Sequence, residues 1–228
     1  MISSRPHGDG VPVTGKGICA YERNPLVGNQ AMRALLVKLD DWASRGTPPP
    51  ASMVPRKADG TLVDPTQAAM GFPDIPGVQF TGRMHTGDLF DYGPNANKGI
   101  TTIWPPKLVG SPYPAKVPSV DRDGNTIPGL RLPDIIAATG TYTGWNNRAN
   151  PTRDGCDSFG MFVPFAATKA EREASGDPRL SVEERYADHA AYVRAVKQAA
   201  DGLVSKGLLL QEDADRYVAA AEASRVRM

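Results

Sequence analysis

Proline is the feature that most restricts the fold of this chain. Of the 21 prolines in 228 residues, fifteen lie between residues 47 and 133. Proline has no backbone N–H and its ring clashes with the preceding helical turn, so this stretch cannot form regular helix. Its aliphatic and aromatic content is nevertheless too high for a disordered linker. We therefore expect short extended segments, joined by turns, that wrap over a larger body.

Two Asp-Gly pairs divide this region, in "KADGTLV" (57–63) and "DRDGNTI" (121–127). Asp-Gly favours a tight hairpin because glycine adopts positive φ without strain, so we expect short strands on both sides of each pair. The second stretch also imitates the start of an EF-hand calcium loop. That loop needs glycine at its sixth position and glutamate at its twelfth, where this chain has Thr126 and Leu132. A hairpin turn is the better interpretation.

The first predicted helix is "NQAMRALLVKLDDWASRG" (29–46), with Asn29 as N-cap and Gly46 as C-cap. Its large apolar residues recur at the spacing of one helical face. They are Met32, Leu35, Leu36, Leu39 and Trp42. Little sequence before residue 29 offers a surface for this face, so we expect it to lie on a β-sheet encoded upstream of Met1.

Capping boxes begin two further helices, one at Thr168 with Glu171 and one at Ser181 with Glu184. We expect the second helix to run without a break from residue 182 to Gly207. A third helix, over 211–226, should return beside it after a short link. The C-terminal region is therefore predicted to form an antiparallel helical hairpin.

Composition excludes several classes of protein. The formal net charge of +1 gives no basic surface for nucleic acid. The chain has no apolar run of about 18 residues, and its N-terminal residues lack the apolar stretch of a signal peptide. We therefore expect a soluble chain and leave its compartment open, since any export signal would lie upstream of Met1. Its two cysteines, Cys19 and Cys156, match neither a zinc site nor a disulfide framework. We expect two free thiols, with pairing in an oxidising compartment as the alternative.

No complete catalytic motif is present. The chain lacks a glycine-rich phosphate loop, Gly-x-Ser-x-Gly and Ser-x-x-Lys, and His85 and His189 have no partners at metal-ligand spacing. We therefore expect no metal and no cofactor. The densest unusual cluster is "TYTGWNNR" (141–148). Its candidate substrate-binding residues are Tyr142, Trp145, Asn146 and Arg148. The alternative is that Trp145 anchors a loop on the core while Asn146 and Arg148 hold its backbone.

His7 stands in "SSRPHGDG" (3–10), between a proline and two glycines. A histidine near a chain terminus is usually exposed and idle. Its order relative to the helix at 29–46 is nevertheless compatible with an α/β-hydrolase, in which the triad histidine follows the final core strand and precedes a closing helix. His7 is the candidate catalytic residue on this basis.

The chain resembles the C-terminal part of the large bacterial alpha/beta hydrolase domain proteins. The shorter segments that carry the resemblance are "NPL" (24–26), "RALLVKLDDWASRGTPPPAS" (33–52), "ADGTLV" (58–63) and "TYTGWNNR" (141–148). The longer C-terminal segments are "FVPFAATKAEREASGDPRLSVEERY" (162–186) and "LLLQEDADRYV" (208–218). The resemblance implies an incomplete α/β fold that supplies the triad histidine, His7, to an enzyme acting on ester or acyl bonds. The serine nucleophile and most candidates for the acid are absent, so the chain alone should be inactive.

On this interpretation the chain has three parts. Residues 1–46 end the hydrolase core with the histidine loop and closing helix, 47–165 form the proline- and glycine-rich extension with short strands, and 166–228 form the C-terminal helices. Two alternatives remain. The chain is a non-catalytic binding or scaffold module that folds independently, or it is one subunit of a split enzyme whose nucleophile comes from a separate polypeptide.

Overall fold

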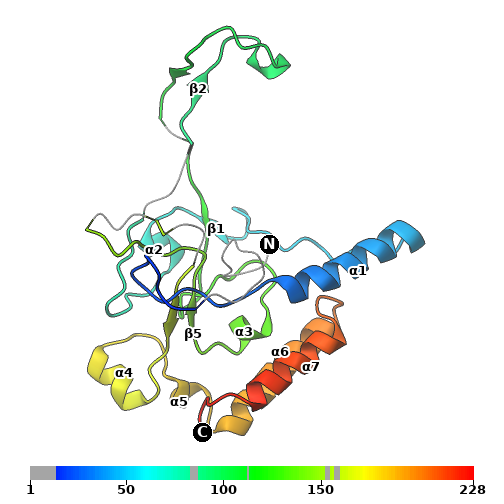
Figure 1. The fold of residues 1–228 in the computed structure, drawn as a ribbon, viewed down its shortest axis with the longest axis vertical. Coiled ribbons are helices and arrows are strands. Elements are labelled where there is room, and N and C mark those ends of the chain that lie inside the picture. Colours follow the sequence, from blue (N-terminus) through cyan, green and yellow to red (C-terminus); the bar gives the residue numbers. More distant parts are fainter. Residues whose placement is uncertain (1–13, 83–86, 112, 152–154, 157–159) are drawn as a thin grey trace.

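The computed structural model describes residues 14–82, 87–111, 113–151, 155–156 and 160–228 (Figure 1). The α-helices are α1 (Asn29–Arg45), α2 (Gln67–Met70), α3 (Pro133–Ile136), α4 (Lys169–Ser175), α5 (Val182–Arg185), α6 (His189–Val204) and α7 (Gln211–Glu222). A 3-10 helix, η1, spans Ala96–Lys98. The strands are β1 (Leu62–Val63), β2 (Phe90–Asp91), β3 (Lys107–Leu108), β4 (Val117–Pro118), β5 (Gly140–Tyr142) and β6 (Phe162–Pro164).

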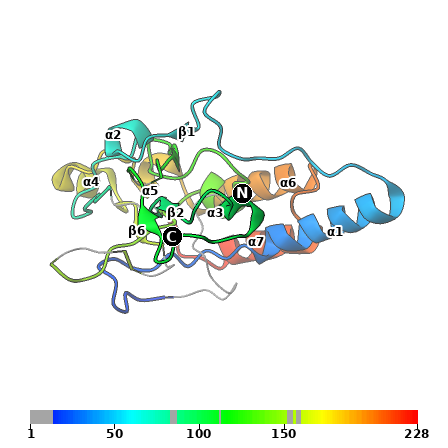
Figure 2. The same ribbon diagram turned by 90° about the horizontal axis from the view of Figure 1, so that it is seen from above.

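The described strands form three separate two-stranded antiparallel sheets, which pair β1 with β4, β2 with β3 and β5 with β6. The three longest helices lie together, with α6 and α7 antiparallel and α1 beside them, whereas α2 lies next to β1 (Figures 1 and 2). Within the described residues the architecture is therefore helices joined to small sheets, without a parallel strand pair.

The C-terminal hairpin of α6 and α7 confirms the predicted antiparallel pair. The prediction of one continuous helix from residue 182 is wrong, because the helix stops at Tyr186 and α6 starts afresh at His189. Asp188 caps the new helix by accepting from the Ala191 N–H at 2.6 Å. The carbonyls left free at the break, those of Tyr186 and Ala187, accept from the Arg227 guanidinium, so the interruption loses no hydrogen bonds at these groups.

Both predicted capping boxes are present. The Thr168 hydroxyl accepts from the Glu171 N–H at 3.2 Å, and the Glu171 carboxylate accepts in return from the Thr168 N–H. Ser181 and Glu184 exchange the same pair of bonds at the start of α5. Local side-chain chemistry thus determines where these helices begin.

Helix α1 ends at Gly46 as expected, with φ of 68°, while Gly28 rather than Asn29 occupies the N-cap. The side that packs on the protein is made of small residues, since Ala31 and Ala34 are fully buried. Ala31 joins a core with residues from the loop before α3 and from the C-terminal hairpin. That core also contains Leu130, Leu132, Ala200, Leu203, Leu208, Leu209 and Ala214.

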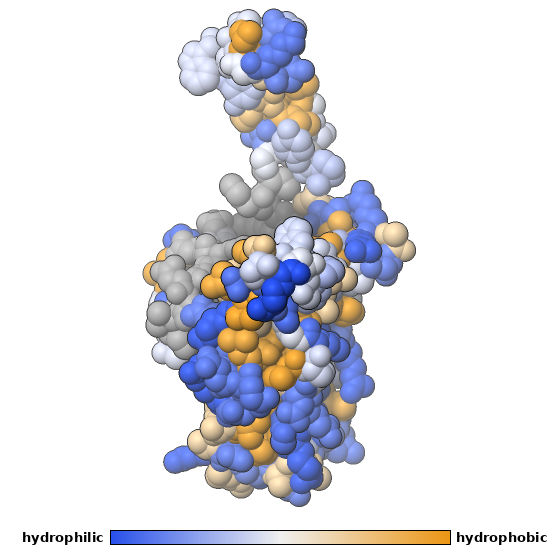
Figure 3. Space-filling model, turned by 90° about the vertical axis from the view of Figure 1, so that its right-hand side faces the viewer, coloured by the Kyte–Doolittle hydropathy of each residue, from blue (hydrophilic) through white to orange (hydrophobic). Residues whose placement is uncertain are grey.

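The large apolar face of α1 is exposed. Relative exposures are Met32 59%, Leu35 37%, Leu36 66%, Leu39 53% and Trp42 54%. Figure 3 views the side of the molecule toward which α1 projects, and apolar surface lies open there among polar side chains. The described residues leave much of this stripe uncovered, and we call it the α1 apolar face.

The proline-rich region forms short strands and turns, as predicted. Across Asp123–Gly124 the chain makes a tight hairpin, in which the Asp121 N–H donates to the Asn125 carbonyl at 2.8 Å and Val120 pairs with Thr126. The hairpin expected at 59–60 is wrong, since β1 follows that turn but pairs with β4. The Thr61 and Leu62 N–H groups both donate to the Arg56 carbonyl, at 3.1 and 3.0 Å, so this segment closes as a turn and not as a two-stranded ladder.

Residues 87–111 form an arm that stands away from the body, with β2 and β3 paired along it (Figure 1). Phe90 lies opposite Leu108, and the Val109 N–H donates to the Leu89 carbonyl at 2.9 Å. The arm exposes bulky side chains, above all Trp104 at 81%.

Candidate functional site

Residues 141–148 begin in β5 and continue into a loop that lies beside the N-terminal segment 14–24. The Ala20 N–H donates to the Asn147 carbonyl at 2.7 Å, and the Ala149 N–H donates to the Ile18 carbonyl at 3.0 Å. Further along this segment, the Asn24 N–H donates to the Gly160 carbonyl at 2.9 Å. The N-terminal segment is therefore held along both the 146–149 loop and the chain entering β6.

Trp145 packs in an aromatic cluster. Its ring centroid lies 5.5 Å from that of Phe72 and 5.7 Å from that of Phe80, the latter edge-on. The backbone beside it is fixed by Thr143, whose hydroxyl accepts from the Met161 N–H at 3.0 Å. Trp145 therefore anchors the loop on the core. This is the role that the alternative to substrate binding predicted for it.

Asn146 is buried and uses its amide on the backbone. Its Nδ2 donates to the carbonyls of Tyr21 and Gly160, both at 3.2 Å, and its Oδ1 accepts from the Asn147 N–H at 2.8 Å. Arg148, at the end of the loop, donates from Nε to the Gly155 carbonyl at 3.2 Å. These two side chains join the loop to both neighbouring segments.

Tyr142 is buried and stacks on Phe162, with ring centroids 4.8 Å apart. Its hydroxyl shares a hydrogen bond with Thr139 Oγ1 at 3.0 Å. Burial raises the pKa of Tyr142, so the phenol stays neutral at ordinary pH. The neutral Tyr142 side chain therefore packs against Phe162 and shares a hydrogen bond with Thr139.

Two cavities adjoin this region. One, of about 60 Å³, is lined by Trp145 and Asn146; its other lining residues are Phe80, Thr81, Gly82, Asn147 and Gly155. The other is an open groove of about 490 Å³, lined by Tyr21, Asp74, Ile75, Pro76, Gly77, Val78, Gln79 and Gly176. The first is smaller than the roughly 300–1,000 Å³ typical of small-molecule sites, and the second falls within that range.

Cys19 and Cys156 form a disulfide, so the expectation of two free thiols is wrong. Their Cα atoms lie 5.5 Å apart across 137 positions of sequence. The pairing of Cys19 with Arg148, and the bond from Arg148 to Gly155, bring the two cysteines together. Sequence spacing carried no sign of this contact because it depends on tertiary structure.

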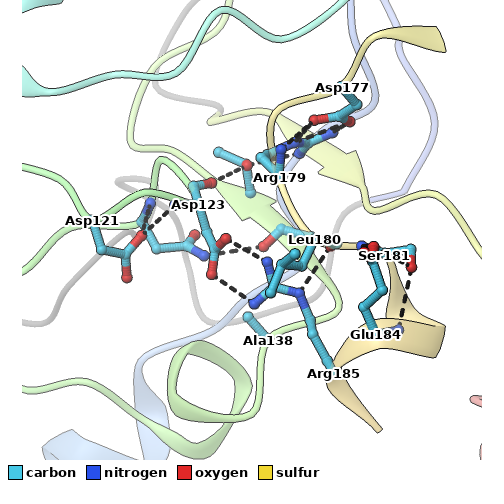
Figure 4. A network of polar contacts seen from close by, with 12 residues as sticks. Asp121, Asp123, Ala138, Asp177, Arg179, Leu180, Ser181, Glu184 and Arg185 are labelled. Carbon is cyan, nitrogen blue, oxygen red and sulfur yellow. Dashed lines mark hydrogen bonds and ion pairs between the residues drawn. The ribbon is translucent and has the colours of Figure 1, made fainter. Parts of the chain in front are cut away.

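A buried polar network, which sequence reasoning missed, lies against β5 and β6 (Figure 4). Arg179 uses all five of its N–H donors. Nε donates to Asp177, Nη1 to Thr141 Oγ1 and the Val163 carbonyl, and Nη2 to Asp177 and the Pro164 carbonyl. No donor remains for a bound anion, so Arg179 holds this part of the fold together.

The aspartates of "DRDGN" belong to the same network. Asp123 accepts from both terminal nitrogens of Arg185, whose guanidinium lies 4.0 Å from the centroid of the Phe165 ring. Asp121 accepts from Arg131 at 2.6 Å and from the backbone N–H groups of its own turn. Both carboxylates are thus engaged by protein groups, and no cluster of metal-ligating side chains occurs in the described part of the chain.

Of the three histidines, only His189 lies within the described residues. His7, the candidate catalytic residue, and His85 lie outside the described residues. His189 lies at the start of α6, with Nδ1 2.8 Å from the Val226 carbonyl and Nε2 3.2 Å from the Glu222 carbonyl. It therefore links the beginning of α6 to the C-terminal end of the chain.

Comparison with known proteins gives one result. The family described as alpha/beta hydrolase domain matches residues 4–219. No curated protein and no solved structure matches the chain. Among the helices in the described residues, none has the length and apolarity to cross a bilayer.

Proposed function

Because the chain belongs to the alpha/beta hydrolase domain family, we propose that it is the C-terminal portion of a serine-hydrolase-like domain acting on ester or related acyl bonds. In this proposal residues 1–46 complete the hydrolase core, 47–165 extend over it, and 166–228 pack the C-terminal helices against α1. The proposed catalytic contribution is His7.

The α1 apolar face is the observation that carries this proposal. Four of the five large side chains of this face are more than half exposed and Leu35 is 37% exposed, while Ala31 and Ala34 of the same helix are buried. Covering what remains exposed of these five side chains is worth roughly 5 kcal/mol at ordinary burial energies. A closing helix of an α/β-hydrolase has such a surface to place against the sheet, which supports the docking of α1 on a sheet from the rest of the domain.

The described sheets support the same assignment. All three are two-stranded and antiparallel, whereas the nucleophile of an α/β-hydrolase sits at a strand-to-helix turn on top of a larger sheet. The proposed nucleophile therefore comes from residues other than those described, and with it come the carboxylate and the oxyanion N–H groups.

His7 would take the proton of the serine hydroxyl as the serine attacks the acyl carbon, and return it to the leaving alcohol. A carboxylate would hold the ring in the correct tautomer. The cavity beside Trp145 and Asn146 is too small for an acyl substrate. In this proposal the four candidate binding residues therefore hold the 141–148 loop in place; they are Tyr142, Trp145, Asn146 and Arg148. Without the serine and the oxyanion groups, we expect the chain alone to be inactive.

The test compares hydrolysis of p-nitrophenyl butyrate by the purified chain, its His7→Ala variant and a His85→Ala control. We expect no turnover that depends on His7. Turnover lost in His7→Ala and kept in His85→Ala would contradict the proposal. The reading frame upstream of Met1 supplies the positive test: we expect it to encode a strand, Gly-x-Ser-x-Gly and a helix, and expression of that longer protein should give His7-dependent hydrolysis.

A binding or scaffold module is the second candidate, favoured by the projecting arm with Trp104 at its surface. Such a module would be monomeric and unfold in one sharp transition. A chain with an uncovered α1 apolar face should instead self-associate or unfold broadly. Circular dichroism combined with size-exclusion chromatography separates the two candidates.

A further inference from the structure

The N-terminal segment 14–24 is held to the body mostly by polar contacts. Besides the bonds from Ala20 and Asn24, the Phe162 N–H donates to the Glu22 carbonyl at 2.9 Å, and Asn24 Nδ2 donates to the Thr143 carbonyl at 2.9 Å. Each of these hydrogen bonds replaces a hydrogen bond to water in the unfolded chain, so its net contribution to stability is small. These contacts align the segment but hold it weakly.

Little apolar burial adds to them. Cys19 and Asn24 are the only residues of this segment that are fully buried, and its one large aliphatic side chain, Ile18, is 56% exposed. Its one aromatic side chain, Tyr21, is half-buried and packs on the core that contains Met70 and Phe72. Ordering the segment costs conformational entropy, and the burial of so little apolar surface offsets only a small part of that cost. A covalent link to the body is therefore the strongest interaction that the segment makes.

We propose that the Cys19–Cys156 disulfide fastens the N-terminal segment onto the 141–162 region, and that the chain acquires its working fold in an oxidising compartment. Both sulfurs belong to buried residues, exposed 2% and 0%, so a reductant reaches them only after local opening. A buried disulfide of this kind persists once formed and is characteristic of proteins that fold outside the reducing cytosol.

Formation of the bond needs a two-electron oxidant, for which we name a protein disulfide. The thiolate of one cysteine attacks a sulfur of that disulfide, which forms a mixed disulfide and releases the first thiolate of the oxidant. The thiolate of the second cysteine then attacks the sulfur of the first, which closes the Cys19–Cys156 bond and releases the second thiolate. In sum, two thiols of the chain lose two electrons and two protons, and the oxidant becomes a dithiol.

One consequence rests on the proposed function. His7 stands twelve positions before Cys19 in the sequence, so the fastened segment limits how far the candidate catalytic residue can lie from the 141–162 region. The disulfide would then act as a positioning device for His7, and its loss would lower hydrolysis by the complete domain.

The proposal is tested on the purified chain without an activity measurement. Free thiols are counted in denaturant on protein recovered from an oxidising compartment, and backbone hydrogen exchange is followed with and without dithiothreitol. A Cys19→Ala/Cys156→Ala variant repeats the exchange measurement without reductant. A Leu209→Ala variant, changed in the core of α1, α6 and α7, controls for general destabilisation.

We expect no free thiols, and at least tenfold faster exchange at the amides of Ala20, Asn24 and Ala149 after reduction, with a clearly smaller loss of protection in α6. Leu209→Ala should leave exchange in the segment unchanged. Two free thiols, unchanged exchange after reduction, or equal loss of protection in the segment and in α6 would each overturn the proposal. None of these results depends on hydrolysis, so failure of the hydrolase assignment leaves the test intact.

Discussion

Arg179 and Asp177 form a buried ion pair, with Nη2 of the arginine 2.6 Å from Oδ2 of the aspartate and side chains that are 2% and 9% exposed. The same guanidinium donates to the carbonyls of Val163 and Pro164 in β6 and to the hydroxyl of Thr141 in β5. The pair thus connects the loop after α4 to the hairpin that carries the candidate site.

Arg179→Leu should lower the free energy of unfolding by about 3–5 kcal/mol, because it leaves a buried carboxylate without its partner. The measurement is urea denaturation followed by circular dichroism. Arg194→Leu, which removes an exposed arginine of α6, is the matched control and should change stability by less than about 0.5 kcal/mol. Equal effects from the two substitutions would mean that the ion pair does not stabilise this region.

Stability should fall in acid through two carboxylates. The Ser181 backbone N–H, the Ser181 hydroxyl and Arg172 lower the pKa of Glu184 to about 2. Burial opposes ionisation of Asp177, but its bonds to Arg179 outweigh burial and lower the Asp177 pKa. Depressed pKa values mean that the unfolded chain binds protons first as pH falls, so the stabilisation present above about pH 4.5 is lost toward pH 2.

Urea denaturation at pH values between 6 and 2 checks this prediction. Glu184→Gln should reduce the slope of stability against pH in the acid range, and Ser181→Ala, which keeps the backbone donor, should reduce it less. A wild-type profile that stays flat down to pH 2 would show that neither carboxylate is stabilised by folding.

The break before α6 gives a prediction about capping. Asp188→Ala should cost about 1 kcal/mol, because it removes the acceptor of the Ala191 N–H. Asp188→Asn keeps an acceptor oxygen and should retain most of the stability. Thermal unfolding of the two variants makes the comparison, and an Asn variant as unstable as the Ala variant would contradict the assigned cap.

Removal of the disulfide should be strongly destabilising. The bond joins residues 137 positions apart, and for a loop of this length the chain-entropy model gives about 5 kcal/mol as an upper value. Cys19→Ala/Cys156→Ala should therefore show a large drop in urea midpoint. A midpoint equal to that of the wild-type protein would mean that the bond constrains neither the folded nor the unfolded chain.

The parts of the fold that local chemistry determines could be predicted from the sequence. The capping boxes at Thr168 and Ser181, the glycine that ends α1 and the turn at Gly124 all depend on residues within a few positions of one another. The break before α6 carried a local signal too, since Asp188 is a good N-cap, but the apolar periodicity continued across it and hid the interruption.

Contacts that tertiary structure creates could not be predicted. Nothing near Cys19 in the sequence indicates Cys156, and Arg179 meets Thr141 and Val163 only because β5 and β6 pair. For the candidate site, the sequence identified the 141–148 loop, and the structure shows how its side chains hold the backbone. His7 lies outside the described residues, so its catalytic role stays a prediction.

The most direct test of the central claim is analytical ultracentrifugation of the chain and of a Leu36→Lys/Leu39→Lys variant over a range of concentrations. Both leucines lie on the α1 apolar face and are more than half exposed. If that face is built to lie on another surface, the wild-type chain should self-associate with rising concentration, and the variant should stay monomeric with an unchanged unfolding transition. A wild-type chain that is monomeric throughout, or a variant that unfolds at markedly lower urea, would contradict the account.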